Sequence, residues 1–143
     1  MSRRAETIDL LTQVSRTVRG RTRVALAPLD LSPATARALR TLGRRDGPTR
    51  MSDLADALQI GRRSTTDVVE LLVARGFLAR TPDPHDGRAT VVSLTAAGEA
   101  VLRRMESQRR RIATEVAAPL DDAEIAQLHR LLAKLIDGHR AGH

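Results

Sequence analysis

The sequence predicts a mainly helical fold with a small two- or three-stranded β wing, in which a winged helix-turn-helix lies between N- and C-terminal helices. Three observations predict it. Residues 51–74 carry apolar side chains at helical spacing on both sides of Gly61. Residues 77–94 form two β-branched runs around a segment rich in turn-forming residues. Phe77 is the one aromatic residue, so aliphatic side chains must build the core, which favours helix-on-helix packing.

Two amphipathic helices are predicted in the first of these segments. The first covers residues 51–58, and Gly61 is expected to supply the turn after it. The second begins at Arg62 and ends at Gly76, because glycine readily takes the left-handed conformation. Its inward face is expected to consist of Thr65, Val68, Val69 and Leu72.

The outward face at the start of the second helix carries the candidate base-reading residues. In a helix-turn-helix, the N-terminal residues of the recognition helix contact base edges in the major groove. Arginine suits guanine because two of its N–H groups match the O6 and N7 acceptors. The candidates are Arg62, Arg63, Ser64, Thr66 and Asp67.

A β hairpin is predicted directly after this helix. Its strands cover residues 77–81 and 88–94, and Asp86-Gly87 is expected to make the tight turn between them. Phe77 is expected to pack in the core where the first strand leaves the helix. The second helix is therefore followed by a wing.

Two helices are predicted before the helix-turn-helix. Residues 5–26 have the pattern of a long amphipathic helix, which Pro28 ends. Ser32 is a good cap for a second helix, which Gly47-Pro48 is expected to stop.

The C-terminal segment predicts two more helices, and the last has an apolar face without an obvious partner. Thr95 is expected to cap the first of them, and Asp121-x-x-Glu124 resembles a capping box that opens the second. The apolar face of the last helix consists of Ile125, Leu128, Leu132, Leu135 and Ile136. Apolar faces at both ends of a small chain indicate a homodimer made by the two ends together.

Several motifs of this chain resemble those of a known family. They are Leu54-Ala55, Arg63-Ser64-Thr65-Thr66, Arg75-Gly76-Phe77-Leu78, Pro82-Asp83-Pro84-His85-Asp86-Gly87-Arg88 and Val92-Ser93-Leu94-Thr95. With residues 27–33 upstream and the helical C-terminal part, the chain resembles the MarR family of winged helix-turn-helix regulators. The sharpest element is Asp86-x-Arg88, followed by Ser93-Leu94-Thr95.

The resemblance implies a sequence-specific transcriptional regulator that binds double-stranded DNA, a dimeric repressor released by a small-molecule effector. In a single domain over residues 1–143, we expect residues 33–95 to bind DNA and residues 5–30 and 96–140 to form dimerisation helices. A two-fold dimer places its recognition helices about 34 to 36 Å apart, so the operator should be an inverted repeat. The alternative is a ligand-independent or nucleoid-type architectural DNA-binding protein.

The resemblance also implies roles for the wing residues. Arg88 would enter the minor groove, since narrow A·T-rich grooves attract an inserted guanidinium. Asp86 would hold that side chain through a charge-assisted hydrogen bond. His85 at the tip either joins this contact or is an exposed turn residue without a role.

Two positions depart from the pattern of the family. Arg50 stands where the family often has a Ser or Thr cap, which leaves the helix start less well defined and puts a cation near a possible phosphate. Asp67 stands where a basic or polar residue is common. Three roles are open for Asp67. It forms an ordinary surface ion pair with Arg63, it accepts a hydrogen bond from a cytosine amine, or it holds Arg63 in position to bind a guanine. The brace is our working hypothesis.

The charge of the chain favours a polyanionic partner without identifying it. The net charge is +7, from 23 arginines and one lysine against 17 acidic residues. Much of the excess lies in residues 16–23 and 37–50, where it is either solvated or in contact with phosphate or an anionic ligand. The resemblance implies a site for a small anionic or lipophilic effector, with Arg16, Arg19 and Arg37 as candidates. No aromatic wall is available there to stack on a phenol.

The composition excludes several classes of protein. Without cysteine, the chain has no disulfides, zinc–thiolate sites or thiol-based peroxide sensing. Histidines lack metal spacing, and no phosphate loop or nucleophile elbow is present, so we expect no enzyme, metal or cofactor. No run approaches the ~18 apolar residues that span a bilayer, and no signal peptide follows Met1. We therefore expect a cytoplasmic protein without a membrane partner.

Overall fold

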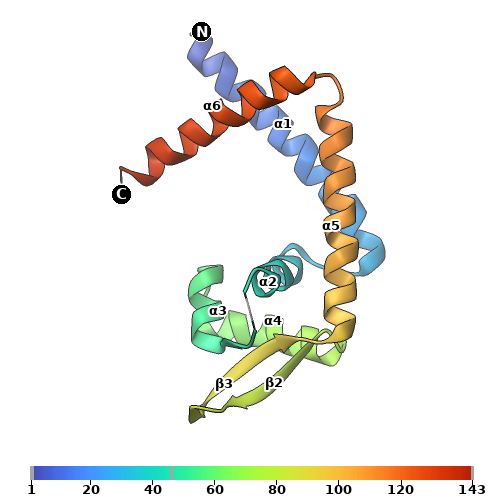
Figure 1. The fold of residues 1–143 in the computed structure, drawn as a ribbon, viewed down its shortest axis with the longest axis vertical. Coiled ribbons are helices and arrows are strands. Elements are labelled where there is room, and N and C mark those ends of the chain that lie inside the picture. The colour runs from blue at the N-terminus through green and yellow to red at the C-terminus, as the bar shows by residue number, and fades with distance from the viewer. Residues whose placement is uncertain (1, 46, 143) are drawn as a thin grey trace.

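The computed structural model describes residues 2–45 and 47–142, which form a mainly helical fold with a three-stranded wing. The predicted fold class is therefore confirmed. The helices are α1 (Arg3–Leu26), η1 (Ala27–Leu29), α2 (Pro33–Gly43), α3 (Met51–Leu58), α4 (Arg62–Ala74), α5 (Ala96–Ala117) and α6 (Asp122–Arg140). The strands are β1 (Thr49–Arg50), β2 (Leu78–Asp83) and β3 (Asp86–Leu94). In Figure 1, α2, α3, α4 and the hairpin form one lobe, from which α5 leads to α6.

The core of this lobe is aliphatic and lies between α2, α3 and α4. Leu39, Leu54, Val69 and Leu72 are fully buried, and Leu58 is nearly so. The predicted inward face of α4 is confirmed, since all four of its residues are buried. Phe77 is partly buried and packs against the same core, as its β propensity predicted.

The turn between α3 and α4 covers residues 59–61 and contains Gly61, as predicted. Gln59 takes the left-handed conformation in it, with φ 54°. Gly61 has an ordinary φ of −65° and caps the start of α4. Gln59 closes α3 because its N–H bonds to the carbonyls of the last turn. The prediction for Gly76 is confirmed, with φ 80° directly after α4.

The hairpin turn lies two residues before the predicted position. Strand β3 begins at Asp86, so the turn residues are Pro84 and His85, and Gly87 is part of the strand. The Asp83 carboxylate accepts the backbone N–H of His85 at 2.9 Å, which stabilises a turn two residues earlier than Asp86-Gly87. A register shift between Pro82 and Asp83 accompanies this turn.

Strand β1 adds a third strand to the hairpin. The sheet order is β1-β3-β2, and Thr49 and Arg50 pair with Val92 and Val91 of β3. The base of the wing is therefore fixed to the segment that enters α3. Helix α2 ends at Gly43, before the predicted stop at Gly47-Pro48, because glycine weakens the helix at that point.

The caps at the helix starts follow the prediction. The hydroxyl groups of Ser32 and Thr95 accept backbone N–H groups three residues later, at 3.1 Å in both helices. Asp121 and Glu124 form the reciprocal pair of hydrogen bonds of a capping box at the start of α6.

The end of α4, the base of the wing and the start of α5 meet at Phe77. Its N–H donates to Leu72 at 2.9 Å, and its carbonyl accepts the N–H of Thr95 at 3.1 Å. The Thr95 hydroxyl donates to the Gly76 carbonyl at 2.5 Å. Gly98 packs so closely that an added Cβ would overlap the Phe77 carbonyl oxygen.

We predict that Gly98→Ala lowers the free energy of unfolding by about 1 to 3 kcal/mol, because backbone must move to make room. Gly20→Ala is the matched control, since a Cβ at this position of α1 meets no atom outside its own helix within 4 Å. It should raise helix stability by up to about 1 kcal/mol. Urea denaturation measures both, and unchanged stability of Gly98→Ala would contradict the close packing at Phe77.

Candidate nucleic-acid interface

The start of α4 presents the predicted reading residues to solvent. Arg62, Arg63, Ser64 and Asp67 are exposed, and Thr66 is partly exposed. The Thr66 hydroxyl donates to the Arg62 carbonyl at 2.9 Å, so it can only accept a further hydrogen bond. This surface offers guanidinium donors for base or phosphate acceptors.

The expected pair between Arg63 and Asp67 is not formed. Among the described residues, no ion pair within 4.0 Å joins the two side chains, although they stand one helical turn apart. Both are exposed, and the gain from such a surface pair barely exceeds the entropy lost in forming it. The predicted brace is therefore not formed in this structure, and the Asp67 carboxylate is exposed.

The wing places its three predicted residues on an exposed tip. His85, Asp86 and Arg88 are all exposed. The Asp86 carboxylate accepts the backbone N–H of Arg88 at 3.1 Å. Within the described chain, it makes no ion pair with the Arg88 guanidinium, contrary to the expected holding role. The side chain of Arg88 is free to extend from the tip.

The strongest ion pair near the wing was not predicted. Arg50 Nε lies 2.6 Å from Asp83 Oδ2, and the Asp83 side chain is only 6% exposed. The hydrogen bond from the His85 backbone, together with Arg50, lowers the pKa of the Asp83 carboxyl, although burial opposes the shift. The sequence predicts Arg50 near a phosphate but does not indicate its pairing with Asp83, because the two residues stand 33 positions apart.

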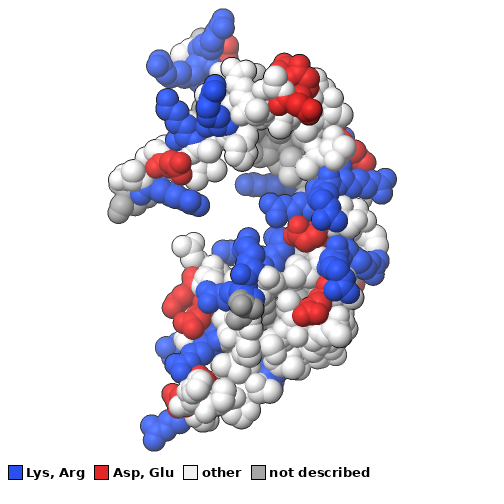
Figure 2. Space-filling view, viewed as in Figure 1, with Lys and Arg blue, Asp and Glu red and all other residues white. Residues whose placement is uncertain are grey.

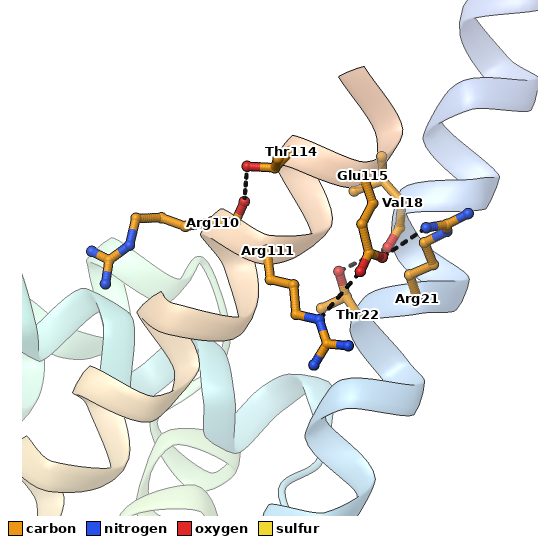
Figure 3. Close-up of polar contacts among 7 residues, drawn as sticks. All are labelled: Val18, Arg21, Thr22, Arg110, Arg111, Thr114 and Glu115. Atoms are coloured by element: carbon orange, nitrogen blue, oxygen red, sulfur yellow. Dashed lines mark hydrogen bonds and ion pairs between the residues drawn. The ribbon is translucent and has the colours of Figure 1, made fainter. Parts of the chain in front are cut away.

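A second site of interest is a largely apolar pocket between α1, α2 and α5. Its volume is about 440 Å³, and its apolar lining includes Val18, Leu26, Met105, Ile112 and Val116. Figure 3 shows the neighbouring contact of α1 with α5, where Glu115 lies between Arg21 and Arg111. The distances are 2.9 Å to Arg21 and 3.2 Å to Arg111.

Three arginines also line this pocket, and none of them is among the effector candidates predicted from sequence. They are Arg40, Arg44 and Arg109, and the acidic Glu106 lines the pocket as well. Burial lowers the pKa of Arg40, and repulsion from Arg109 and Arg44 adds to the effect. The candidates Arg16, Arg19 and Arg37 are exposed and lie outside the lining. The pocket therefore holds an excess of positive charge beside an apolar wall.

Basic side chains are spread over both parts of the molecule. Figure 2 shows Lys and Arg at the tip of the wing, over the lobe of α2 to α4 and along the long helices, interleaved with acidic groups. In the part of the chain that the structure describes, no cluster of three or more His, Cys, Asp or Glu could hold a metal ion. No described helix is both long and apolar enough to cross a membrane.

A helix-turn-helix with an exposed basic start to its second helix, followed by a wing, defines the class of winged helix-turn-helix transcriptional regulators. The family model described as MarR family matches residues 29–89. This part of the chain, which holds the helix-turn-helix and much of the wing, belongs to that family.

Known proteins support this assignment. The transcriptional repressor NicR of Pseudomonas putida is 33% identical over 94 residues, which cover 66% of this chain and 60% of NicR. The repressor Rv2887 of Mycobacterium tuberculosis is 29% identical over 126 residues, 88% of this chain and 90% of that protein. A MarR family protein from Bacillus stearothermophilus has a similar structure, with a TM-score of 0.85 and 26% identity over 98% of this chain and 99% of the other.

The lowered pKa of Asp83 predicts a pH dependence of stability. A carboxylate with a depressed folded-state pKa stabilises the fold above its unfolded pKa and loses this contribution as pH falls through the folded value. Asp83→Asn should therefore lower the free energy of unfolding at pH 7, and the difference from wild type should shrink below about pH 4.

Urea denaturation between pH 7 and pH 3 measures this difference. Asp67→Asn is the control, because its exposed carboxylate has no ion pair in the described structure. It should change stability by less than about 0.5 kcal/mol at either pH. A stability loss in Asp83→Asn that stays constant down to pH 3 would show that the charge of Asp83 is unimportant.

Proposed function

We propose that this chain is a sequence-specific repressor of transcription that binds an inverted-repeat operator as a homodimer and is released by a small anionic effector. The observation that carries the proposal is the position of two sets of exposed arginines on one lobe. Arg62 and Arg63 start α4, and Arg88 extends from the wing. We assign base reading to the start of α4, together with Ser64, Thr66 and Asp67, and minor-groove contact to Arg88, with His85 and Asp86 beside it.

Exposed apolar side chains on the outer helices support the homodimer. Helix α6 has no buried residue in the single chain. Large apolar side chains are exposed on α1 and α6, namely Ile8, Leu10, Val14, Val18, Val24, Leu128, Leu131, Leu135 and Ile136. A soluble chain rarely leaves such faces to water, so we assign residues 5–30 and 96–140 to dimerisation and residues 33–95 to DNA binding.

The pocket between α1, α2 and α5 supports an effector that carries both an acidic group and an aliphatic body. Arg40 is repelled by Arg109 and Arg44, and Glu106 offsets this repulsion only in part, so a bound anion is favourable. The wall beside them is aliphatic. The pocket lies between α1, α5 and α2 of the DNA-binding lobe. A bound effector therefore releases the DNA if it favours a spacing of the two recognition helices that does not fit the operator.

The specific-repressor proposal is distinguished from an architectural DNA-binding protein by a titration on operator and random DNA. A specific regulator keeps a preference of ~10³ or more over random sequence at two salt concentrations. An architectural protein shows no such preference. Repeating the titration with an aliphatic carboxylate present tests whether this ligand releases the protein from the operator. Arg40→Gln should weaken that effect of the carboxylate.

We predict that Arg88→Ala lowers operator affinity by about tenfold to a hundredfold, because the minor groove loses an inserted guanidinium. Arg4→Ala is the matched control. It removes the same charge from an exposed position in the first turn of α1, outside the residues assigned to DNA binding and to dimerisation. Fluorescence anisotropy with operator DNA measures both variants, and equal affinity for Arg88→Ala and the control would refute the assigned role of the wing.

We predict that the double variant Leu128→Asp, Leu135→Asp is monomeric, because charges on the exposed apolar face of α6 prevent its burial between subunits. Sedimentation measures the assembly state. Leu71→Asp is the control, since Leu71 is 59% exposed on α4, outside the outer helices. A dimer that survives the α6 double variant would exclude this face from the interface.

A further inference from the structure

A basic pocket lies where the helix-turn-helix meets the wing. It has a volume of about 380 Å³, and its lining comes from the starts of α3 and α4 and from the sheet. Three arginines from separate elements line it: Arg50 before α3, Arg62 in α4 and Arg80 in β2. No acidic residue is among the lining residues. The pocket therefore has the charge and the donors to hold an anion.

Arg50 is held in place by a partner behind the pocket. Its Nε donates to Asp83 at 2.6 Å, and the Asp83 carboxylate is buried and also accepts the His85 N–H. This bond uses one of the five guanidinium N–H groups. Within the described part of the chain, the terminal amino groups of Arg50 have no hydrogen-bond partner, and its side chain is 46% exposed.

Arg62 and Arg80 can bind an anion without losing a strong ion pair. Arg80 lies 3.9 Å from Glu70, a long contact between exposed side chains that contributes little. Arg62 is exposed and makes no ion pair among the described residues. Side-chain hydroxyls of Ser52, Thr66 and Thr90 also line the pocket. An entering anion therefore meets three guanidinium groups, one of which is already oriented.

We propose that this pocket seats one phosphate of the DNA backbone, and that Asp83 is a positioning residue that orients Arg50 for it. The proposal rests on the proposed DNA-binding function and adds Arg50, Arg80 and Asp83 to the interface. The pocket lies between α4 and the wing, so the phosphate belongs to the backbone between the major groove read by α4 and the minor groove read by Arg88. Guanidinium groups bind phosphate in a bidentate manner, and orientation before binding reduces the entropy lost.

The experiment uses the full chain and operator duplexes in which each phosphate of a half-site is replaced, one at a time, by a neutral methylphosphonate. For wild type, one replacement between the two grooves should lower affinity about tenfold, the size of one charged hydrogen bond. Arg50→Ala should bind the duplex with the methylphosphonate at that position as tightly as it binds the unmodified duplex. Its salt dependence, d log K/d log[salt], should be shallower by about 0.9 per subunit. Arg4→Ala, which loses the same charge outside both assigned surfaces, should keep the wild-type methylphosphonate profile.

Asp83→Asn tests the positioning role. It keeps an oxygen for the His85 N–H but removes the charge that holds Arg50, so it should lose sensitivity to the same phosphate. The double variant with Arg50→Ala should bind no more weakly than Arg50→Ala alone. Circular dichroism verifies that each variant is folded. If Asp83→Asn does not fold, the phosphate contact is tested with Arg50→Ala alone, because its side chain is 46% exposed.

Three results would overturn the proposal. The first is a wild-type methylphosphonate profile that Arg50→Ala leaves unchanged. The second is additive losses from Asp83→Asn and Arg50→Ala. The third is that inorganic phosphate at millimolar concentration binds through Arg50 but does not change the affinity for the operator. That result would identify a site for free anions. Failure of wild type to prefer the operator over random DNA would instead refute the proposed function.

Discussion

The end of the recognition helix, the base of the wing and the start of α5 share one set of hydrogen bonds around Phe77. Leu72, Thr95 and Gly76 all take part, and Gly98 packs directly against the Phe77 carbonyl. Protein interiors are close-packed, so the parts joined here move together rather than bend independently. The direction of α5 is therefore set by the same few residues that set the direction of α4. A displacement of the first turn of α5 therefore also displaces the end of α4.

The DNA-binding lobe is braced a second time at the opposite end of the wing. Arg50 precedes α3 and contacts Asp83 next to the turn, while β1 pairs with β3. Because the Asp83 carboxylate is buried, salt screens this pair less than a surface pair. Helix-turn-helix and wing thus form one unit with fixed spacing between Arg63 and the wing tip. The side chains that we assign to DNA contact are exposed on that support, which separates the tasks of positioning and contact.

Periodicity and capping predicted the fold well, and long-range pairing explains what they missed. The inward face of α4, the Thr95 cap and the Asp121 capping box depend on neighbours within four residues, which the sequence displays directly. The hairpin turn was misplaced because Asp86-Gly87 is locally favourable, whereas Asp83 stabilises Pro84-His85 instead. The Arg50 contact with Asp83 joins residues far apart in the chain, and no local pattern indicates it. In the pocket, Arg40 and Arg44 stand one helical turn apart at the end of α2, but only the packing of α2 against α5 brings Arg109 beside them.

The unburied face of α6 has a consequence for how such a regulator responds to its own abundance. In the proposed dimer, the outer helices complete their hydrophobic packing only when two chains associate, so assembly follows the law of mass action. The concentration of operator-competent protein then rises with the square of the monomer concentration while monomers predominate. Dilution, as during cell growth without new synthesis, would empty the operator more steeply than the loss of chains alone.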